Sequence, residues 1–373
     1  MDNSSNYIQE LLKKMVGANA SDLFITVNFP PAFKVDGKIV PVSKVNLSIE
    51  QVRHLVTGIM NSKQQKEFHD TKECNFAVAY DGIGRFRVNC FVQQSHWGMV
   101  FRTIKTEIPK VEDLLLPETL KEIVMAKRGM ILVVGATGSG KSTSLAAMIG
   151  HRNANSQGHI ITVEDPIEYV HDHNKSLITQ REVGVDTDSW GSALKNTLRQ
   201  APDVILIGEI RDRETMEYAV AFSETGHLCL ATLHANSANQ ALERIINFFP
   251  EERKQQVLMD LSLNLKSVIS QRLIPKKGGG RIAAVEIMLN TPFISDLIYK
   301  GAVSDIKDVM TKSKDQGMQT FDQALFDLYQ KNIISLDDAL RNADSMNDLR
   351  LKIKLASGGV SNIGSLDGVA ISK

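Results

Sequence analysis

The chain has 373 residues, of which 43% are hydrophobic, and its 43 lysines and arginines balance 43 aspartates and glutamates. This length accommodates two domains, while the composition and zero net charge exclude a disordered polyelectrolyte and a generally basic nucleic-acid coat. Three dispersed cysteines exclude a disulfide framework and a four-thiolate zinc site, and they indicate a reducing compartment. No apolar run approaches the roughly 18 residues that a membrane span needs, so we expect a chain that is neither exported nor membrane-spanning.

The first hundred residues alternate between helical and strand patterns. Apolar residues first recur at helical spacing, then alternate on both sides of an Asp-Gly turn, and then form a third apolar run. This pattern predicts a small α+β domain with helices on one face of a sheet. The predicted helices span 7–15 and 52–59, and the predicted strands span 74–80, 86–92 and 99–104.

Pro109 and Pro117 bracket a polar stretch, and we place an interdomain linker at 107–117, after an N-terminal domain of residues 1–106. Beyond it, short apolar runs alternate with helical patterns, as in parallel strands that are buried on both faces. The sequence predicts an α/β domain over 118–356 with helices at its end, and a disordered tail over 357–373. The predicted strands are 131–134, 160–163, 204–207, 228–232 and 282–288.

A phosphate-binding motif follows the first of these strands. The segment matches G-x-x-x-x-G-K-[ST], and Thr143 continues it into a helical pattern. Its glycines let backbone amides surround an anion, Lys141 can reach the β- and γ-phosphates, and Ser142 is the expected Mg²⁺ ligand. The sequence therefore predicts a site for a nucleoside triphosphate. The motif comprises Gly135, Ala136, Thr137, Gly138, Ser139, Gly140, Lys141 and Ser142.

Carboxylates follow two other buried strands. Glu209 ends Val204–Ile207 in the manner of a Walker B acid, with Gly208 where many such motifs have aspartate, so Glu209 alone takes the metal-side role. Three acids follow the other strand, Glu164, Asp165 and Glu168, and Pro166 fixes the turn between them. One of these three is expected to polarise the attacking water. Solvated acids at a strand exit are the alternative for each residue taken singly, but the pair beside a P-loop indicates an ATPase.

Two histidines and a group of arginines are further candidates. His227 and His234 bracket a short apolar strand, where phosphate sensing or subunit contact is favoured over zinc, which would need three or four ligands. A structural hydrogen bond is an equal alternative for His227. Arg87 and Arg102 lie on neighbouring predicted strands, and they either offset charge on the γ-phosphate or form solvated surface.

The series of motifs resembles the type IV pilus retraction ATPases of the PilT/PilU family, within the secretion ATPase superfamily, over residues 1–356. The resemblance implies a PAS-like N-terminal domain, a RecA-like core with C-terminal helices, and nucleotide held between the two domains of a homo-hexamer. It further implies that Glu168 is the catalytic carboxylate, Glu209 the Walker B acid, His227 and His234 a histidine-box pair, and Arg87 and Arg102 phosphate-contacting arginines. The motifs that carry it are Ser21-Asp22-Leu23, 84–89, 135–142, 164–168, Gln180-Arg181-Glu182-Val183, Gly208-Glu209 and 225–234.

One segment departs from the retraction motors of the family. Where these carry an arginine-bearing Ala-Ile-Arg motif, Thr291–Lys300 contains no arginine, and the chain is more similar to PilU, whose members are accessory motors. The resemblance thus implies a Mg²⁺-dependent ATPase that powers or assists pilus retraction and twitching motility. Its implied partners are a PilT-type paralogous ATPase and an inner-membrane pilus platform protein, and its implied location is the cytoplasmic face of the inner membrane.

Two other functions compete with this interpretation. An ATP-binding structural adaptor with little turnover would share the P-loop, but Glu168 and Glu209 are both present. A DNA translocase would need a basic channel, whereas the net charge is zero, and we expect no nucleic-acid partner. Pilus-extension and type II secretion motors commonly carry a four-cysteine zinc element, which three scattered cysteines cannot supply.

Overall fold

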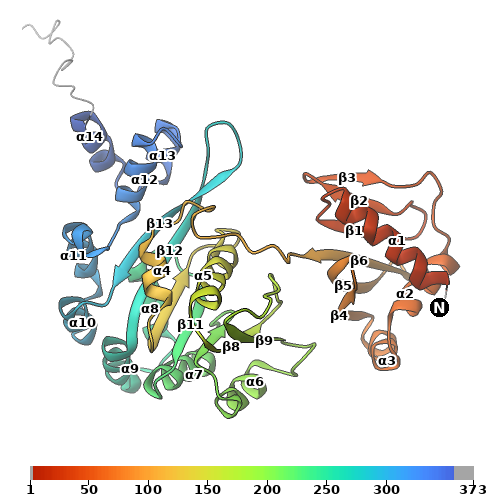
Figure 1. The fold of residues 1–373 in the computed structure, drawn as a ribbon, viewed down its shortest axis with the longest axis horizontal. Helices are drawn as coiled ribbons and strands as arrows, with labels where there is room; N and C mark the ends of the chain where they lie inside the picture. Colours follow the sequence, from red (N-terminus) through yellow and green to blue (C-terminus); the bar gives the residue numbers. More distant parts are fainter. Residues whose placement is uncertain (1–2, 357–373) are drawn as a thin grey trace, which may run out of the picture. The chain divides into compact units, whose positions relative to one another are not determined.

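The computed structural model describes residues 3–356, and the segment 357–373, for which the sequence predicts disorder, lies outside the described residues. The chain forms two compact units (Figure 1). One unit combines the chain up to Ile108 with His159–Pro202, and the other combines Pro109–Gly158 with the chain from Asp203 onwards. The domain boundaries proposed from the sequence, including the linker at 107–117, stay predictions.

The N-terminal part is an antiparallel sheet of six strands in the order β3-β2-β1-β6-β5-β4. The predicted hairpin and third strand are confirmed as β4 (Glu73–Tyr80), β5 (Gly84–Gln93) and β6 (His96–Ile104). Sequence reasoning missed three short strands that complete the sheet, β1 (Asp22–Ile25), β2 (Ala32–Val35) and β3 (Lys38–Pro41). Four residues are too few for a clear alternation to be recognised.

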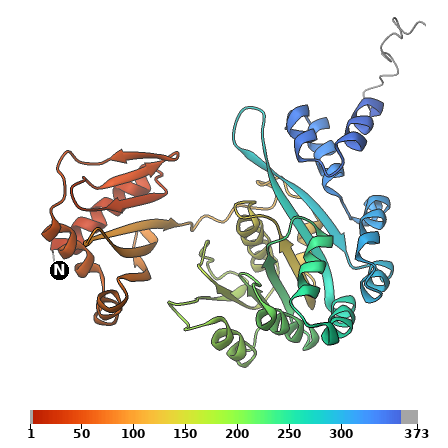
Figure 2. The same cartoon turned by 180° about the vertical axis from the view of Figure 1, so that it is seen from behind.

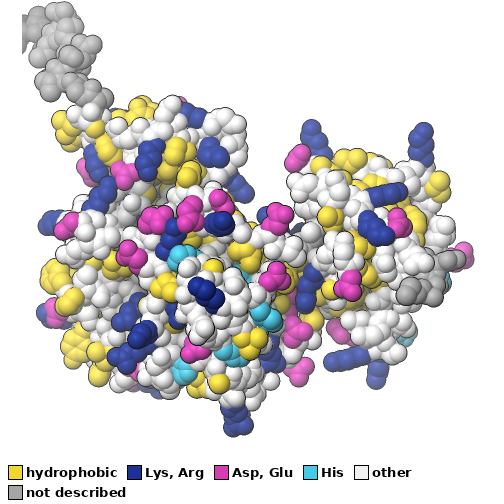
Figure 3. Space-filling model, viewed as in Figure 1, with side chains coloured by type: hydrophobic (Ala, Val, Ile, Leu, Met, Phe, Trp, Pro, Cys, Tyr) yellow, Lys and Arg dark blue, Asp and Glu magenta, His cyan; other side chains and the backbone are white. Residues whose placement is uncertain are grey.

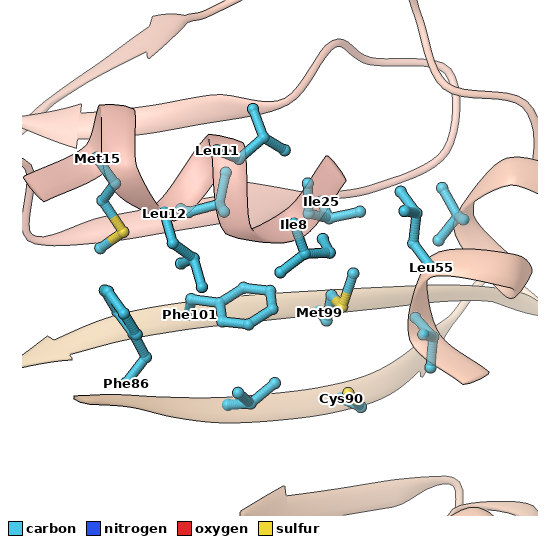
Figure 4. Packing of buried hydrophobic residues seen from close by; sticks show 14 of the residues in the cluster. Ile8, Leu11, Leu12, Met15, Ile25, Leu55, Phe86, Cys90, Met99 and Phe101 are labelled. Carbon is cyan, nitrogen blue, oxygen red and sulfur yellow. The ribbon is translucent and has the colours of Figure 1, made fainter. Parts of the chain in front are cut away.

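Helices cover one face of this sheet. The predicted helices are confirmed as α1 (Asn3–Gly17) and α2 (Ile49–Ile59), and α3 (Ser62–Thr71) follows. Figure 4 shows how α1 directs Ile8, Leu12 and Met15 onto Phe101 and Phe86 of the central strands. All five side chains are fully buried, so burial of apolar surface holds the helix on the sheet.

The second sheet has seven strands in the order β13-β12-β7-β11-β10-β8-β9, and all the predicted strands of this region are confirmed within it. β7 pairs in parallel with β11 and β12, β11 pairs in parallel with β10, and β13 returns antiparallel to β12. Strands β7, β10 and β11 are buried along their whole length, as their continuous apolar sequences predict. The strands are β7 (Gly129–Val134), β8 (Gly158–Glu164), β9 (Ser176–Glu182), β10 (Val204–Ile207), β11 (Leu228–Leu233), β12 (Leu265–Pro275) and β13 (Arg281–Leu289).

Helices lie between the strands of this sheet along the chain. They are α4 (Thr119–Val124), α5 (Lys141–Asn155), α6 (Trp190–Thr197), α7 (Arg213–Glu224), α8 (Ala238–Asn247) and α9 (Glu251–Asn264). The α/β class expected from the sequence is therefore confirmed. Among the described residues, no helix combines the length and the apolar character that crossing a bilayer requires.

Five C-terminal helices follow the long β12–β13 hairpin (Figures 1 and 2). The last three of them pack around a small core of their own with Ile274 and Ile282 of the hairpin. Arg272 of β12 joins them to the sheet, since it donates to the Asn342 carbonyl at 2.8 Å, pairs with Asp344 at 2.8 Å and lies 3.8 Å from the centre of the Phe321 ring. The helices are α10 (Pro292–Tyr299), α11 (Ile306–Lys312), α12 (Phe321–Gln330), α13 (Leu336–Asn342) and α14 (Met346–Ala356).

Candidate nucleotide site

The P-loop runs from the buried strand β7 into α5, as the motif predicts. Gly140 has φ +89°, and a Cβ atom there would lie 2.6 Å from Nε2 of Gln271. A Cβ atom on Gly135 would lie 2.4 Å from Oγ of Ser139. Both positions therefore require glycine, because any side chain would fill the space around which the loop closes.

Gln271 of β12 holds this loop from behind. Its side chain is buried, donates from Nε2 to the Ser139 carbonyl at 2.8 Å, and accepts a 2.7 Å hydrogen bond from the Ser144 hydroxyl. Sequence reasoning did not select Gln271. The available signal was a polar run, Ser270-Gln271-Arg272, between the apolar pairs Val268-Ile269 and Leu273-Ile274.

Lys141 provides the cation of the loop. Its ammonium donates to the carbonyls of Gly135 at 2.8 Å and Ala136 at 3.0 Å. Burial lowers the pKa of Lys141, while the nearby Glu209 carboxylate acts in the opposite direction. The buried Oγ of Ser139 has no hydrogen-bond partner among the described residues. The Lys141 ammonium and the Ser139 hydroxyl thus lie at the N-terminal end of α5, and this arrangement suits an anion.

Glu209 and His234 lie at the same edge of the sheet as the loop, because β7, β10 and β11 are parallel and Leu233 stands in register with Val134. Oε1 of Glu209 is 2.9 Å from Nε2 of His234. Its Oε2 accepts a 2.8 Å hydrogen bond from Nε of Arg211, a residue that sequence reasoning did not select. The signal for Arg211 was its position two residues after Glu209, the predicted Walker B acid.

His227 lies at the opposite end of the same strand. Its carbonyl accepts from the Gly129 amide at the start of β7, and its Nδ1 is 3.0 Å from Oγ1 of Thr225. The six residues of β11 separate His227 from His234, and the seven steps between the two histidines span about 23 Å at the usual rise of a strand. Within one chain the structure therefore does not bring His227 to the P-loop, and it makes the structural hydrogen bonds that the alternative interpretation expected.

The acidic segment after β8 belongs to the other compact unit. Oε1 of Glu164 accepts hydrogen bonds from Thr162 at 2.6 Å and from Gln180 at 3.2 Å, and the carboxylate also accepts from the Glu168 amide. Burial raises the pKa of Glu164. Glu168 itself is exposed. The two acids thus differ, since Glu164 is enclosed by donors and Glu168 faces outward.

The predicted arginines share one face of the N-terminal sheet, where Arg87 and Arg102 stand directly opposite each other on β5 and β6. Nε of Arg102 is 2.8 Å from Oδ1 of the buried Asp22, and Ser21 donates to the other oxygen of Asp22 at 2.7 Å. Two like charges in this position repel each other unless an anion lies nearby. Asp22 supplies one such anion and explains the Ser21-Asp22 motif in physical terms.

Two cavities lie beside the P-loop. One, of about 750 Å³, is lined by Ala136, His234 and residues of α8. The other, of about 330 Å³, is lined by Gly140, Thr143 and Leu273 together with Leu114, Leu115 and Leu116. The first has polar walls beside the start of the loop, and the second combines apolar side chains with the charged residues Asp113, Lys276 and Arg281.

Comparison with known proteins identifies the family of the chain. The family model described as "Type II/IV secretion system protein" matches residues 3–288. The type IV pilus ATPase PilU of Pseudomonas aeruginosa is 61% identical over 94% of this chain and 92% of its own length. The type IV pilus retraction ATPase PilT of the same organism is 44% identical, over 90% of this chain and 98% of its own length.

Solved structures agree with the sequence comparison. The crystal structure of the pilus retraction motor PilT with bound ADP superposes with a TM-score of 0.86 at 39% identity, covering 92% of this chain and 99% of the other. The Legionella pneumophila ATPase DotB superposes with a TM-score of 0.77 at 25% identity, covering 94% and 96%. The resemblance inferred from the motifs is confirmed, and the chain belongs to the type II/IV secretion system protein family.

Proposed function

We propose that this chain is a Mg²⁺-dependent ATPase that powers or assists type IV pilus retraction, and that it acts as an accessory motor of the PilU type. The observation that carries the proposal is the shared sheet edge at which the P-loop, Glu209 and His234 meet. The names of the relatives, a pilus ATPase and a pilus retraction ATPase, support the biological setting.

The residues of the P-loop fit a nucleotide. Lys141 now satisfies its ammonium with two loop carbonyls, and phosphate oxygens would replace these acceptors. The amides of 135–143 would surround the phosphates, and the cavity behind Gly140 and Thr143, with its apolar leucines, suits the adenine ring. The ADP in the PilT crystal structure belongs to a protein of the same fold.

The acid at the sheet edge fits a magnesium ion. Mg²⁺ prefers oxygen ligands and keeps several waters, so one hydroxyl and one carboxylate beside the phosphates suffice. Ser142 and Glu209 would hold it, and when bound it would neutralise charge on the β- and γ-phosphates. Arg211 and His234 occupy both Glu209 oxygens, and releasing one partner would free the carboxylate for this role.

The remaining residues have separate tasks in this proposal. Glu168 orients the attacking water and accepts its proton, and its exposure leaves the carboxylate accessible. Arg87 and Arg102 offset the charge that builds on the γ-phosphate. His234 contacts Glu209 and couples the position of this carboxylate to the presence of the γ-phosphate. The role of His227 in the histidine-box pair requires a contact outside this chain, for example at a neighbouring subunit.

The assembly belongs to the same proposal. We place the chain in a homo-hexamer at the cytoplasmic face of the inner membrane, working with a PilT-type paralogue on an inner-membrane pilus platform protein. The segment that lacks arginine forms α10, which exposes Phe293. On the face in Figure 3, acidic and basic side chains of the described residues are interspersed, which suits a protein partner better than a polyanion.

The decisive experiment has two stages. Purified protein should hydrolyse ATP when Mg²⁺ is present, and Lys141→Ala should abolish both turnover and binding of a fluorescent ATP analogue. Pilus retraction is then scored in cells with an active, inactive or absent paralogue. Retraction that needs the paralogue supports the accessory role, retraction without it contradicts that role, and absence of turnover in the native protein contradicts the ATPase assignment itself.

A further inference from the structure

Glu182 is a buried carboxylate that the proposed chemistry does not use. It is the last residue of β9 and only 3% of its surface is exposed. An ionisable side chain is rarely buried to this extent unless other groups compensate its charge. The groups around Glu182 therefore indicate what it does.

Its carboxylate holds the main chain next to Glu168. Oε2 of Glu182 accepts a 3.2 Å hydrogen bond from the Ile167 amide. The following residue, Val183, donates its amide to the Glu164 carbonyl at 2.9 Å. The end of β9 thus fixes the acidic segment at two points, and one of them is the residue immediately before the predicted catalytic acid.

Glu182 is itself fixed by a tight turn. Its amide donates to Oδ2 of Asp186 at 2.9 Å, and the Asp186 amide donates back to the Glu182 carbonyl at 2.8 Å. A short parallel bridge joins Val183 to Thr187 across the turn. The main chain of Glu182 has little freedom, so the position of its carboxylate is defined before any ligand binds.

Two arginines of the N-terminal sheet act electrostatically on this carboxylate. Burial raises the pKa of Glu182, and the nearby guanidinium groups of Arg87 and Arg85 lower it in opposition, while Asp186 raises it. Nε of Arg85 is buried and has no acceptor among the described residues. Arg87 is one of the two arginines that we assign to the γ-phosphate, and its charge acts on the same carboxylate that accepts from the Ile167 amide.

The other side of Glu168 is also attached to the N-terminal sheet. Lys105 follows β6 and forms a parallel bridge with Tyr169, and the Val170 amide donates to the Lys105 carbonyl at 3.0 Å. Glu168 therefore stands between two anchors, Ile167 on Glu182 and Tyr169–Val170 on Lys105. Both anchors lie in the compact unit that contains β5 and β6.

We propose that Glu182 is a positioning residue, which holds Glu168 through the Ile167 amide and couples it to Arg87, so that arginine and acid are placed as one piece. This inference rests on the proposed ATPase function and on Glu168 as its acid. A purely structural carboxylate would stabilise the unit equally whether or not Arg87 is present. The coupling to Arg87 is what distinguishes the two roles.

The test uses Glu182→Gln, which keeps an oxygen for the Ile167 amide but removes the charge that faces Arg87. We expect kcat for ATP to fall about tenfold while KM changes less than about twofold, because a misplaced acid affects the chemical step. Glu73→Gln, an exposed glutamate on β4 of the same unit, is the matched control and should leave both constants unchanged. Glu182→Asp should recover part of the loss.

A double-mutant cycle then tests the coupling. In an Arg87→Gln background, Glu182→Gln should lower kcat by less than about twofold, because the partner of the carboxylate is already absent. An unchanged kcat in Glu182→Gln, or the same tenfold loss in both backgrounds, would overturn the proposal. Melting temperatures of all variants show whether a loss of activity reflects unfolding.

Hydrogen exchange without nucleotide gives a measurement that does not depend on catalysis. In Arg87→Gln, the amides of 167–170 should exchange several-fold faster, because Glu182 loses its counter-charge. Unchanged exchange would also overturn the proposal, even if Glu182→Gln itself did not fold. If the native protein fails to hydrolyse ATP, the proposed function fails, whereas the exchange data still report whether Glu182 and Arg87 are coupled.

Discussion

Glu209 follows the end of strand β10 and Glu182 is the last residue of strand β9, yet their surroundings differ. The Glu209 side chain is 21% exposed, and cationic or polar side chains, Arg211 and His234, contact its two oxygens. Glu182 is buried and accepts from main chain. Partly exposed pairs are worth little and exchange partners readily, whereas a buried charge is costly to leave unpaired. The first arrangement suits an acid that must respond to a ligand, and the second suits an acid that must keep a neighbour in place.

The largest effect should come from the acid that Glu182 supports. Glu168→Gln should lower kcat about a hundredfold or more while ATP binding remains, because the variant lacks a proton acceptor but keeps the P-loop. Steady-state hydrolysis and titration with a fluorescent ATP analogue measure the two quantities. Glu67→Gln, an exposed glutamate on α3, is the control. Near-native turnover in Glu168→Gln would remove this residue from the chemistry.

A smaller effect should follow from altering one partner of Glu209. Arg211→Ala leaves Oε2 of Glu209 without its side-chain donor, and we expect kcat to change by about tenfold or less because His234 still holds the other oxygen. Arg213→Ala is a matched control, since Arg213 makes a similar pair with Glu217 on α7. If both variants behave alike, Arg211 has no particular connection to the site.

Gln271→Ala should act on binding rather than on chemistry. It removes the contacts to Ser139 and Ser144 behind the loop, and unsatisfied buried groups cost about 1–3 kcal/mol of stability. We expect ATP affinity to weaken roughly three- to tenfold as the loop loosens, a scale that corresponds to about 1 kcal/mol. Calorimetric melting and nucleotide titration provide the measurements. Unchanged affinity together with a lower melting temperature would limit Gln271 to a structural role.

The smallest effect concerns a carboxylate between the two extremes. Burial raises the pKa of Asp344, but its ion pairs with Lys307 and Arg272 together lower the pKa by more than burial raises it. The net pKa therefore lies below the usual value. A lowered folded pKa stabilises the protein above the unfolded pKa of about 3.9, and this contribution disappears as the pH falls through the folded value.

Asp344→Asn should therefore lower the melting temperature by roughly 2–4 °C at pH 7, and the difference from the native protein should shrink below about pH 4. Melting curves of both proteins across this range provide the test. A difference that stays constant with pH would show that packing around residue 344, and not its charge, is responsible.

Local motifs made the nucleotide site predictable. The P-loop, Glu209 and His234 each follow a strand, and parallel pairing brings the ends of such strands to one edge of a sheet. The resemblance to the family paired His227 with His234, although the two residues bracket the strand and therefore lie at its opposite ends. The role of His227 in that pair stays a prediction.

Residues that act through contacts distant in sequence could not be predicted in this way. Gln271 meets Ser139 and Ser144 more than a hundred positions away, and arginines on strands of the other sheet act electrostatically on Glu182. Such contacts depend on strand order, which the sequence pattern does not specify. The short strands β1 to β3 escaped prediction for a local reason, because four residues give too little periodicity.

Gln271 and Arg272 are consecutive residues of β12, and their side chains leave the strand toward opposite faces. Gln271 is hydrogen-bonded to the loop that would carry phosphate. Arg272 contacts α12, Asn342 and Asp344 in the C-terminal helical region. A pleated backbone is too stiff for adjacent residues to shift independently. A displacement of Gln271 therefore also displaces Arg272. The C-terminal helices are in this way mechanically attached to the loop through a single peptide unit.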